Sequence, residues 1–273
     1  MEETVIRLAR FVDEKRFGKY RASVVDNQDP QKRGRLKLRI PSVLADQDSD
    51  WALPCLPYGG LKSQGMFFIP DIDAQLWVEF EEGDISRPIW VGSFWQQQDD
   101  VPEDASKDEP TTRMIQTSSG HILQFDDESG EEQFRLYHPA DAEMIIDKQG
   151  SITLTDASGA VLKMDAASNV VTVEDANGNT LTMNSSGTKV EDSNGNIIEM
   201  AAAGITAEAP KIVLKGGQVH LGDEGGEPVI KGQSFLSLFA SHIHTSAPTV
   251  GGPTSPPIPQ GEASSLSTTV KTI

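Results

Sequence analysis

Cysteine and aromatic residues are scarce in this sequence of 273 residues. Cys55 is the single cysteine, which excludes an intramolecular disulfide framework and any cysteine-rich metal site. Aromatic residues make up 6% of the chain and hydrophobic residues 37%, whereas the sequence holds 24 glycines and 16 prolines. This composition is lean for a compact enzyme of such length, and it favours an extended or repetitive architecture.

Basic residues and long apolar runs are also few. The chain has 23 Lys and Arg against 41 Asp and Glu, so its formal net charge is −18. That balance argues against nucleic acid as a partner, because phosphate binding relies on Lys and Arg. No apolar run approaches the ~18 residues of a membrane-spanning helix, and residues 1–16 carry charges throughout, unlike a signal peptide. We therefore expect a protein that is made and folded in the cytosol.

Residues 1–19 are interpreted as an N-terminal arm. Val5, Leu8 and Val12 fall at i, i+3 and i+7, a spacing typical of a short amphipathic helix. A helix this short has little core of its own, so we expect the arm to dock on another element.

Residues 20–98 show the pattern of a compact β domain. Between residues 35 and 40, Arg or Lys alternates with Leu or Ile, which is the period-2 signature of a half-buried strand. Pro54 marks an edge segment, because proline cannot donate to a ladder. Further strand signals occur within 20–27, 51–58, 65–74, 74–80 and 87–95. Short strands with turn signals about every 10 residues favour a small closed barrel.

Two stretches differ in amino-acid composition from the rest of the chain. Residues 99–113 are acidic and contain proline, which is typical of an exposed linker. Residues 233–273 form the expected tip, ending in a tail rich in Gly, Pro and Ser that favours turns and extended chain. Gly251 and Gly252 allow a sharp reversal, so we expect residues 253–273 to lie back along the outside of the preceding repeat.

Residues 114–232 contain an internal repeat. A hexapeptide of Gly, two variable residues, an aliphatic residue, a polar residue and then Met or Phe occurs at 120–125, 159–164, 178–183 and 195–200. Asp156, Asp175 and Asp192 precede the last three glycines, and short alternating strands lie between them. A repeat of about 20 residues is typical of a stacked or wound β structure.

These strands carry too few apolar residues to cover both sides of a sheet. Each offers one narrow row, such as Leu162 with Met164 or Leu181 with Met183. Such a row stays exposed unless another copy of the chain covers it. Several identical chains around one axis, with the apolar rows inward, satisfy this need. The residues do not fix how many, and we choose three, the smallest number that encloses a filled prism, and expect a homotrimer.

The strongest candidate site is the pair His242 and His244, separated by one residue. On an extended strand both imidazoles face one side. In a trimer on a threefold axis they form two rings of three, and six nitrogen ligands suit an octahedral first-row metal ion. The alternative is two ordinary surface histidines in a serine-rich loop. His121, His138 and His220 lack a comparable partner in the sequence and are expected to be structural.

The row of Asp156, Asp175 and Asp192 admits two readings. The three carboxyl groups could serve hydrolysis, but each precedes a turn glycine, where Asp favours the turn by bonding nearby backbone N–H groups. A catalytic pair needs two unlike environments to separate its pKa values, and a repeat supplies like ones. Calcium binding is also disfavoured, because the nonapeptide pattern with consecutive glycines is missing.

The run from Lys32 to Arg39 is the main cationic cluster. A small barrel with such a strand could bind single-stranded nucleic acid through stacked aromatics. Residues 21–98 nevertheless hold 8 basic and 11 acidic residues, and the run itself has no interleaved aromatics. A solvated strand face or a docking surface for an acidic partner is therefore favoured. The four tryptophans are expected in the barrel core or between protomers.

The order of these features resembles the central spike of contractile injection machines. The strings from Asp29-Pro30 to Gly34-Arg35 and from Gly83-Asp84 to Arg87-Pro88 are similar to that family's OB-type domain. The family includes the baseplate assembly protein V of contractile-tailed phages, the VgrG spikes of type VI secretion and the spikes of phage-like extracellular contraction systems. The resemblance covers roughly residues 20–250.

Three features depart from the family pattern. Only the acidic linker stands where the T-even phage spike carries a lysozyme domain. The 19 residues before the barrel cannot supply the large hub region of a full VgrG, and 29 residues follow His244, more than in the short phage spikes.

The resemblance implies an all-β fold, with an N-terminal OB-type barrel followed by a C-terminal intertwined trimeric β-prism or β-helix spike. It implies a non-enzymatic central spike that pierces membranes mechanically, with an iron ion on the trimer axis at His242 and His244. Implied partners are a baseplate hub protein, a tip-capping PAAR-like protein and, transiently, the target cell envelope. The particle would be assembled in the cytoplasm, as part of a virion tail or a secreted injection particle. A trimeric receptor- or polysaccharide-binding tail fibre and a β-helix glycan-cleaving enzyme stay open as alternatives.

Overall fold

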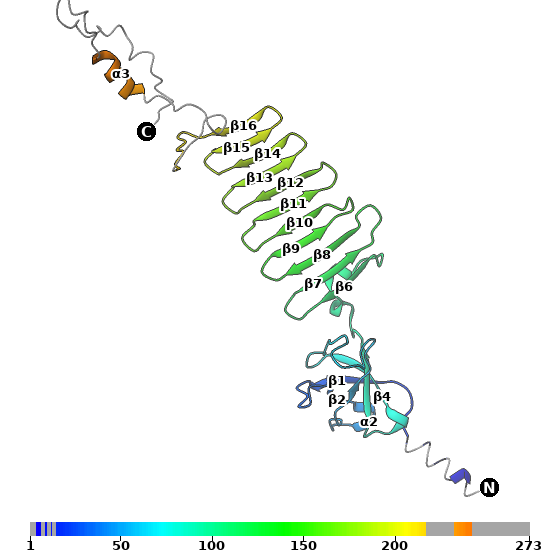
Figure 1. The fold of residues 1–273 in the computed structure, drawn as a ribbon. Helices are drawn as coiled ribbons and strands as arrows, with labels where there is room; N and C mark the ends of the chain where they lie inside the picture. Colours follow the sequence, from blue (N-terminus) through cyan, green and yellow to red (C-terminus); the bar gives the residue numbers. More distant parts are fainter. Residues whose placement is uncertain (1–3, 7–8, 10–11, 13–14, 217–231, 242–273) are drawn as a thin grey trace, which may run out of the picture. The chain divides into compact units, whose positions relative to one another are not determined.

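The computed structural model describes residues 4–6, 9, 12, 15–216 and 232–241. The chain divides into two units, residues 1–207 and 208–273. The first unit contains two sheets, one of five and one of eleven strands, in which nearly all neighbouring strands are antiparallel (Figure 1). The prediction of an all-β fold is therefore confirmed. None of the helices in these described ranges is long and apolar enough to cross a membrane.

The five-stranded sheet has the order β2-β1-β4-β5-β3. Its strands are β1 (Tyr20–Asp26), β2 (Lys37–Arg39), β3 (Leu53–Pro54), β4 (Gln75–Phe80) and β5 (Pro88–Ser93). All pairs are antiparallel except β3 with β5. Backbone bridges from Leu36 to Ala52 and from Arg39 to Asp48 join β2 to the segment that leads into β3. These bridges close the sheet into the expected small barrel.

The prediction of a strand within residues 65–74 of this barrel was wrong. Residues 65–74 contain bends and a turn but no strand. Gly65, with a φ of 147°, and Asp73, with a φ of 68°, interrupt the extended backbone at both ends of the segment. The short helix α2 (Pro41–Leu44) and the 3₁₀ turns η1 (Glu81–Gly83), η2 (Gln98–Asp100) and η3 (Glu103–Ala105) complete this region.

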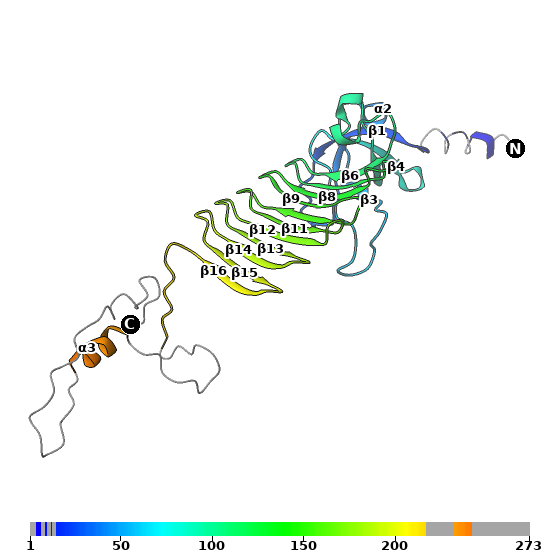
Figure 2. The same cartoon turned by 90° about the horizontal axis from the view of Figure 1, so that it is seen from above.

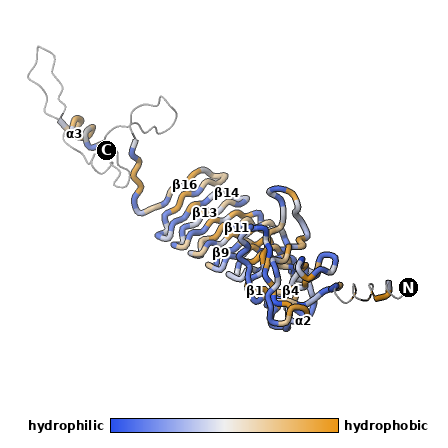
Figure 3. The backbone as a smooth tube through the Cα atoms, turned by 90° about the horizontal axis from the view of Figure 1, so that it is seen from below, coloured by the Kyte–Doolittle hydropathy of each residue, from blue (hydrophilic) through white to orange (hydrophobic). Residues whose placement is uncertain are grey.

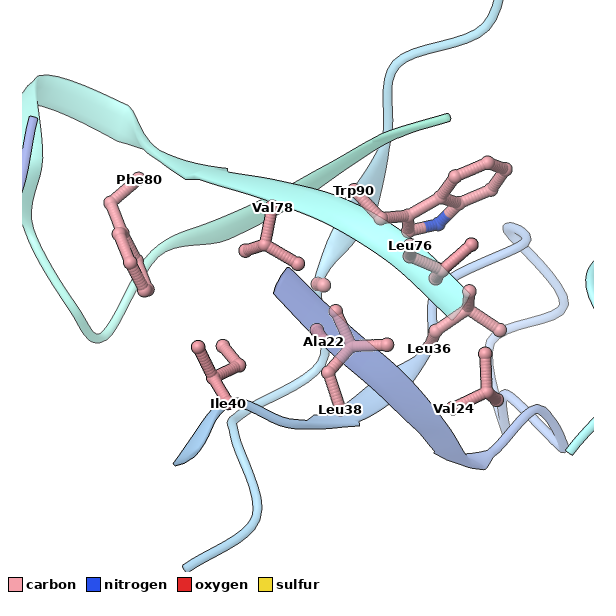
Figure 4. Packing of buried hydrophobic residues seen from close by; sticks show 10 residues of the cluster. Ala22, Val24, Leu36, Leu38, Ile40, Leu76, Val78, Phe80 and Trp90 are labelled. Carbon is pink, nitrogen blue, oxygen red and sulfur yellow. The ribbon is translucent and has the colours of Figure 1, made fainter. Parts of the chain in front are cut away.

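The barrel has a closed apolar core (Figure 4). Leu36, Leu38 and Ile40 are fully buried, whereas the basic residues between them point outward. Leu76 and Val78 of β4 meet them from the opposite wall, as the period-2 pattern predicts. The remaining members of the core are Ala22, Val24, Ala52, Phe80 and Trp90.

The eleven-stranded sheet is a meander in which each strand pairs with the next along the chain. Figures 1 and 2 show these strands as a single layer of successive rungs. The strands are β6 (Thr112–Gln116), β7 (Ile122–Asp126), β8 (Gln133–His138), β9 (Ala142–Ile146), β10 (Ile152–Thr155), β11 (Val161–Asp165), β12 (Val170–Glu174), β13 (Thr180–Asn184), β14 (Gly187–Glu191), β15 (Ile197–Ala201) and β16 (Gly204–Glu208). The four predicted hexapeptides supply β7, β11, β13 and β15, so the repeat corresponds to alternate strands.

Two further helical segments lie before the barrel and after the eleven-stranded sheet in the sequence. Residues 4–6, 9 and 12 have helical backbone, in agreement with the helix expected in the arm. The helix α3 (Gly232–Ser241) was not expected. Its Phe235, Leu238 and Phe239 follow the i, i+3, i+4 spacing of a helical face, and the two phenylalanine rings stack with centroids 5.9 Å apart.

Candidate functional site

The register of the eleven-stranded sheet aligns one aliphatic side chain from every strand between β6 and β15. Each is the direct cross-strand partner of the next, so together they form an aliphatic column across ten strands. The column consists of Ile115, Leu123, Leu136, Met144, Leu154, Leu162, Val173, Leu181, Val190 and Ile198.

A second column runs beside the first, two residues away on every strand and therefore on the same face. It begins at Arg113 and is interrupted only at Thr188. Its apolar members are Phe125, Phe134, Ile146, Ile152, Met164, Val171, Met183 and Met200. We call the two columns together the apolar face; the alternation that produces it is visible in the hydropathy colours of Figure 3.

The opposite face of the same sheet is mostly polar along its central column, which lies one residue out of phase with the apolar face. This column includes Arg135, Lys163, Thr172, Thr182 and Lys189, and its apolar members are Met114 and Ile145. Ion pairs cross this polar face, from Lys163 to Asp165 at 3.1 Å, from Lys189 to Glu191 at 2.7 Å and from Arg135 to Glu143 at 2.6 Å. Such a surface is suited to water, and it needs no covering layer.

Nothing in the described part of the chain shields the whole apolar face. Leu154 is 38% exposed, Val190 45% and Ile198 52%. The only buried side chains in this sheet region are polar: Gln124, Asp126 and Ser151. A continuous apolar strip across ten strands is larger than the scattered hydrophobic residues of an ordinary protein surface, so it marks an interaction site.

The repeat aspartates lie in turns and not in a catalytic row. The carboxylate of Asp175 accepts hydrogen bonds from the backbone N–H groups of Asn177 and Asn179, both at 2.9 Å. The N–H of Gly178 donates to the Asp175 carbonyl oxygen at 3.1 Å, and this glycine has a φ of 84°. Asp147, Asp156 and Asp192 accept the same two bonds in their own turns. The interpretation of Asp156, Asp175 and Asp192 as turn formers is confirmed.

These bonds also set the charge of the turn carboxyls. The Asn179 side-chain amide donates to Asp175 at 2.6 Å, and this bond, with the backbone donors, lowers the pKa of Asp175 to about 2. Equivalent bonds from Ser158 and Asn196 lower the pKa of Asp156 and of Asp192. All three groups are therefore held as anions, and none is tuned as a proton donor.

The histidines of the sheet form a pair that the sequence analysis missed. The rings of His121 and His138 meet edge to face with centroids 4.8 Å apart, so two histidines that have no comparable partner in the sequence contact each other in the fold. Their contact follows from the register, because the adjacent residues Ile122 and Tyr137 are cross-strand partners. The Ala140 N–H donates to His138 Nδ1 at 3.1 Å, which ties this ring to its own turn.

The predicted metal ligands His242 and His244 lie outside the described residues, as does His220. Within the described ranges, no group of three or more His, Cys, Asp or Glu side chains could hold a metal ion. The iron ion therefore stays a prediction from the resemblance. The residues immediately before His242 are helical, since α3 ends at Ser241, whereas the argument for two imidazoles on one side assumed an extended chain.

The Asp29–Arg35 motif organises the barrel's first turn. Asp29 accepts backbone N–H bonds from Gln31, Arg33 and Arg35, and the Arg35 guanidinium bonds it at 2.6 and 3.1 Å. Arg35 holds the pKa of Asp29 well below its usual range, and the pKa of Arg35 rises in return. The Asp29 side chain is only 3% exposed, so this ion pair is a structural element and not a free docking charge.

The basic run is engaged with the barrel itself. The guanidinium of Arg35 and the ammonium of Lys37 each lie 5.5 Å from the ring centre of Trp51. Trp90 is buried and donates its indole N–H to the Gly34 carbonyl at 3.1 Å. These contacts place two tryptophans in structural roles, as expected, and they favour the solvated-face interpretation of the run over a nucleic-acid platform.

Residues 99–113 are less independent than the expected linker. Lys107 bonds Asp126 of β7 at 2.6 Å, and with Thr112 it lowers the pKa of Asp126 to about 2. Asp104 approaches Arg135 of β8 at 3.3 Å. The segment is thus attached to the first strands of the sheet by charge.

Comparison with known proteins identifies the barrel. Residues 20–95 match the family described as the type VI secretion system/phage-baseplate injector OB domain. No curated protein matches the chain. Among solved structures, the G-box domain of the microcephaly protein CPAP is similar over 37% of this chain and 69% of that chain, with 10% identity and a TM-score of 0.27. A TM-score this low bears on neither fold nor function. The family match supports a baseplate or spike component that belongs to a phage tail or injection particle.

Proposed function

We propose that this baseplate component is the central spike of a contractile phage tail or phage-like injection system, and that it acts as a homotrimer. The observation that carries the proposal is the apolar face, which crosses ten strands and is left exposed in the single chain. Three copies that turn these faces toward one axis remove them from water and leave the polar faces outside.

The width of the sheet favours three copies. Its strands are mostly five residues long, which corresponds to about 17 Å. Three walls of that width enclose a triangular prism whose axis lies about 5 Å from each wall. Packed sheets stand about 10 Å apart, so side chains from one sheet reach about 5 Å. Two apolar columns per wall therefore fill the prism, whereas two copies packed face to face would leave their edges open.

Such a prism is suited to a mechanical role. The ladder hydrogen bonds of the meander point along the length of the sheet, at about 4.8 Å per strand. An axial load is carried by this ladder and by the packed interior together. In the proposed mechanism the OB domain attaches the spike to the baseplate hub, and sheath contraction drives the narrow end through the target envelope. No catalytic step is part of this function.

A mass measurement tests the oligomer. Light scattering on the purified full chain should give three times the 29.6 kDa of one chain, and the mass should persist on dilution. A monodisperse single chain would refute the spike. Electron microscopy of assembled particles then separates the spike, on the central axis of the baseplate, from the alternative of a peripheral receptor-binding fibre.

The tip is proposed from the resemblance alone. An iron ion would be bound at His242 and His244 of three chains, and a PAAR-like protein would cap the end. Elemental analysis of protein from iron-replete cells should find about one iron per three chains, with loss of the metal in the double variant His242→Ala, His244→Ala. Protein that carries no transition metal would contradict this part of the proposal and leave the trimer unaffected.

A further inference from the structure

The barrel carries one loop in which most of the large side chains are apolar and exposed. We call residues 58–68, which lie between β3 and β4, the barrel loop. Leu61 is 71% exposed and Phe67 67%, and Tyr58 and Phe68 are also more than half exposed. Residues 56–70 contain one lysine and no Asp or Glu, in a chain that has 41 acidic residues. A concentration of apolar side chains of this kind marks an interaction surface.

The backbone of the barrel loop is held by a hydrogen bond between its limbs and by close packing at its base. The Met66 N–H donates to the Tyr58 carbonyl oxygen at 3.1 Å, so the two limbs of the loop meet at this point. A Cβ atom added at Gly34 would lie 2.9 Å from Ile69, so the residues that follow the loop pack closely on the barrel. The loop therefore projects from the barrel with its apolar tip uncovered.

The eleven-stranded sheet has an apolar trough at its first strands, with a volume of about 590 Å³. Its floor consists of the first five members of the aliphatic column, Ile115, Leu123, Leu136, Met144 and Leu154. Phe68 of the barrel loop lines the same trough, so the loop and the trough are already neighbours within one chain. A cavity of about 150 Å³ holds one benzene ring. The trough therefore has room for further apolar side chains beside Phe68.

The margin of the trough lies at one side of the sheet, where the strands end. Thr117, His121, His138 and Ala142 line this margin. Each lies two residues beyond the aliphatic column and therefore on the same face. In the proposed homotrimer, the sides of the three sheets form the corners where one copy meets the next. The trough therefore opens toward a neighbouring copy.

We propose that the barrel loop of each copy inserts Leu61 and Phe67 into the trough of a neighbouring copy, and that three such loops close the end of the prism formed by β6–β9. The proposal rests on the homotrimer proposed above. Residues 56–70 contain no carboxylate, so insertion buries no unpaired anion. Lys62 lies beside the tip, and its long side chain keeps the ammonium group in water while its stem packs on apolar neighbours.

This contact covers a part of the apolar face that the stack of strands leaves open. The interior strands of the sheet have a further strand on both sides, whereas β6 is the first strand, and its apolar residues adjoin an open end. Water that entered at this end would reach the apolar interior of the prism. The inserted loops exclude that water, and they join the barrel of one copy to the sheet of the next.

Photo-crosslinking in the full-length protein tests the insertion. With p-benzoylphenylalanine in place of Phe67, irradiation should give covalent dimers and trimers on a denaturing gel, and mass spectrometry should find the crosslink within residues 115–155. The matched control carries the same residue in place of Ile85, which is 43% exposed but lies outside the barrel loop. It should give no product that joins residue 85 to the trough.

Two results of this experiment would overturn the insertion. Crosslinks from position 67 that stay within one chain, in protein that light scattering shows to be three chains, would overturn it and leave the spike intact. A single chain in solution would refute the homotrimer itself, and the insertion with it.

Charged substitutions in the barrel loop supply a second arm. Leu61→Asp with Phe67→Asp places carboxylates in the trough, so the urea midpoint of the sheet transition should fall. The barrel transition should not change, because both side chains are largely exposed within one chain. Lys62→Asp is the matched control, because its side chain stays in water, and it should leave both midpoints unchanged. An equal midpoint of the sheet transition in the double variant and the wild type would overturn the proposal.

Discussion

The barrel and the eleven-stranded sheet use the same alternation of apolar and polar residues, but only the barrel buries its apolar face within one chain. Leu36 and Leu76 in the barrel are fully buried, whereas Leu154 and Val190 in the sheet are 38% and 45% exposed. The strand order explains the difference. In the barrel, backbone bridges join β2 at one end of the strand order to the segment that leads into β3 at the other end, so the sheet closes on itself. The meander pairs each strand only with its neighbours along the chain and stays one layer thick. Alternation specifies which face is apolar, and topology decides whether the same chain can cover it.

The largest expected effect comes from a charged residue placed on the apolar face of the sheet, because this tests whether another copy of the chain covers that face. Leu181→Glu places three carboxylates toward the axis of the proposed prism, and burial of unpaired charge opposes assembly. We expect the mass in light scattering to fall from three chains to one, while calorimetry still shows the separate unfolding transition of the barrel.

Thr182→Glu is the matched control for that substitution. Thr182 is adjacent in β13, is also half-buried, and lies on the polar face. We expect this variant to remain a trimer. Equal loss of mass in both variants would show that the two faces are not distinct.

Truncation of a leucine in each region sharpens the contrast. Leu38→Ala removes a fully buried side chain from the barrel, and we expect a loss of about 2–5 kcal/mol in its unfolding free energy. This loss should not depend on protein concentration, because the core lies within one chain. Leu154→Ala should instead lower an unfolding midpoint that rises with protein concentration. Urea unfolding at a low and a high concentration distinguishes them; a concentration effect for Leu38→Ala would contradict the comparison.

The Asp29–Arg35 pair should be the main electrostatic determinant of the barrel. We expect Asp29→Asn to lower the barrel's unfolding midpoint at neutral pH, because it removes charge-assisted bonds around a covered side chain. The folded pKa of Asp29 is depressed, so its stabilisation is fully present above the unfolded pKa of about 3.9. It is lost as the pH falls through the folded value, and the difference between the two proteins should shrink in acid.

Asp48→Asn is the control for that prediction. Asp48 meets Arg39 at the same distance of 2.6 Å, but both side chains are more than 40% exposed. Exposed pairs contribute little, so we expect almost no change in the midpoint at any pH. A change as large as that of Asp29→Asn would show that coverage of the pair is unimportant.

Sequence patterns predicted which residues form strands and which side of each strand is apolar. They were less successful with contacts between strands and with segments that turns interrupt. The period of Leu36, Leu38 and Ile40 and the hexapeptide repeat each gave the correct strands and the correct apolar side. The contact of His121 with His138 was missed because it depends on the register of two strands, which periodicity alone does not supply. Residues 65–74 were mistaken for a strand because their apolar content outweighed the turn conformations at Gly65 and Asp73. The candidate metal ligands His242 and His244 stay a prediction.

The smallest expected effect concerns the turn carboxylates, and it tests whether the sheet's edges matter as much as its faces. With a folded pKa of about 2, the stabilisation by Asp175 is present above the unfolded pKa of about 3.9 and is lost as the pH falls toward 2. Asp175→Asn keeps an oxygen acceptor for the N–H groups of Asn177 and Asn179 but removes the charge. We therefore expect a small loss at pH 6 that is about halved at pH 3 and nearly vanishes below pH 2, measured as the urea midpoint of the sheet transition. Glu174→Gln, one residue away, should show no such convergence. A loss for Asp175→Asn that stays constant with pH would mean that hydrogen-bond geometry, and not the anion, holds the turn.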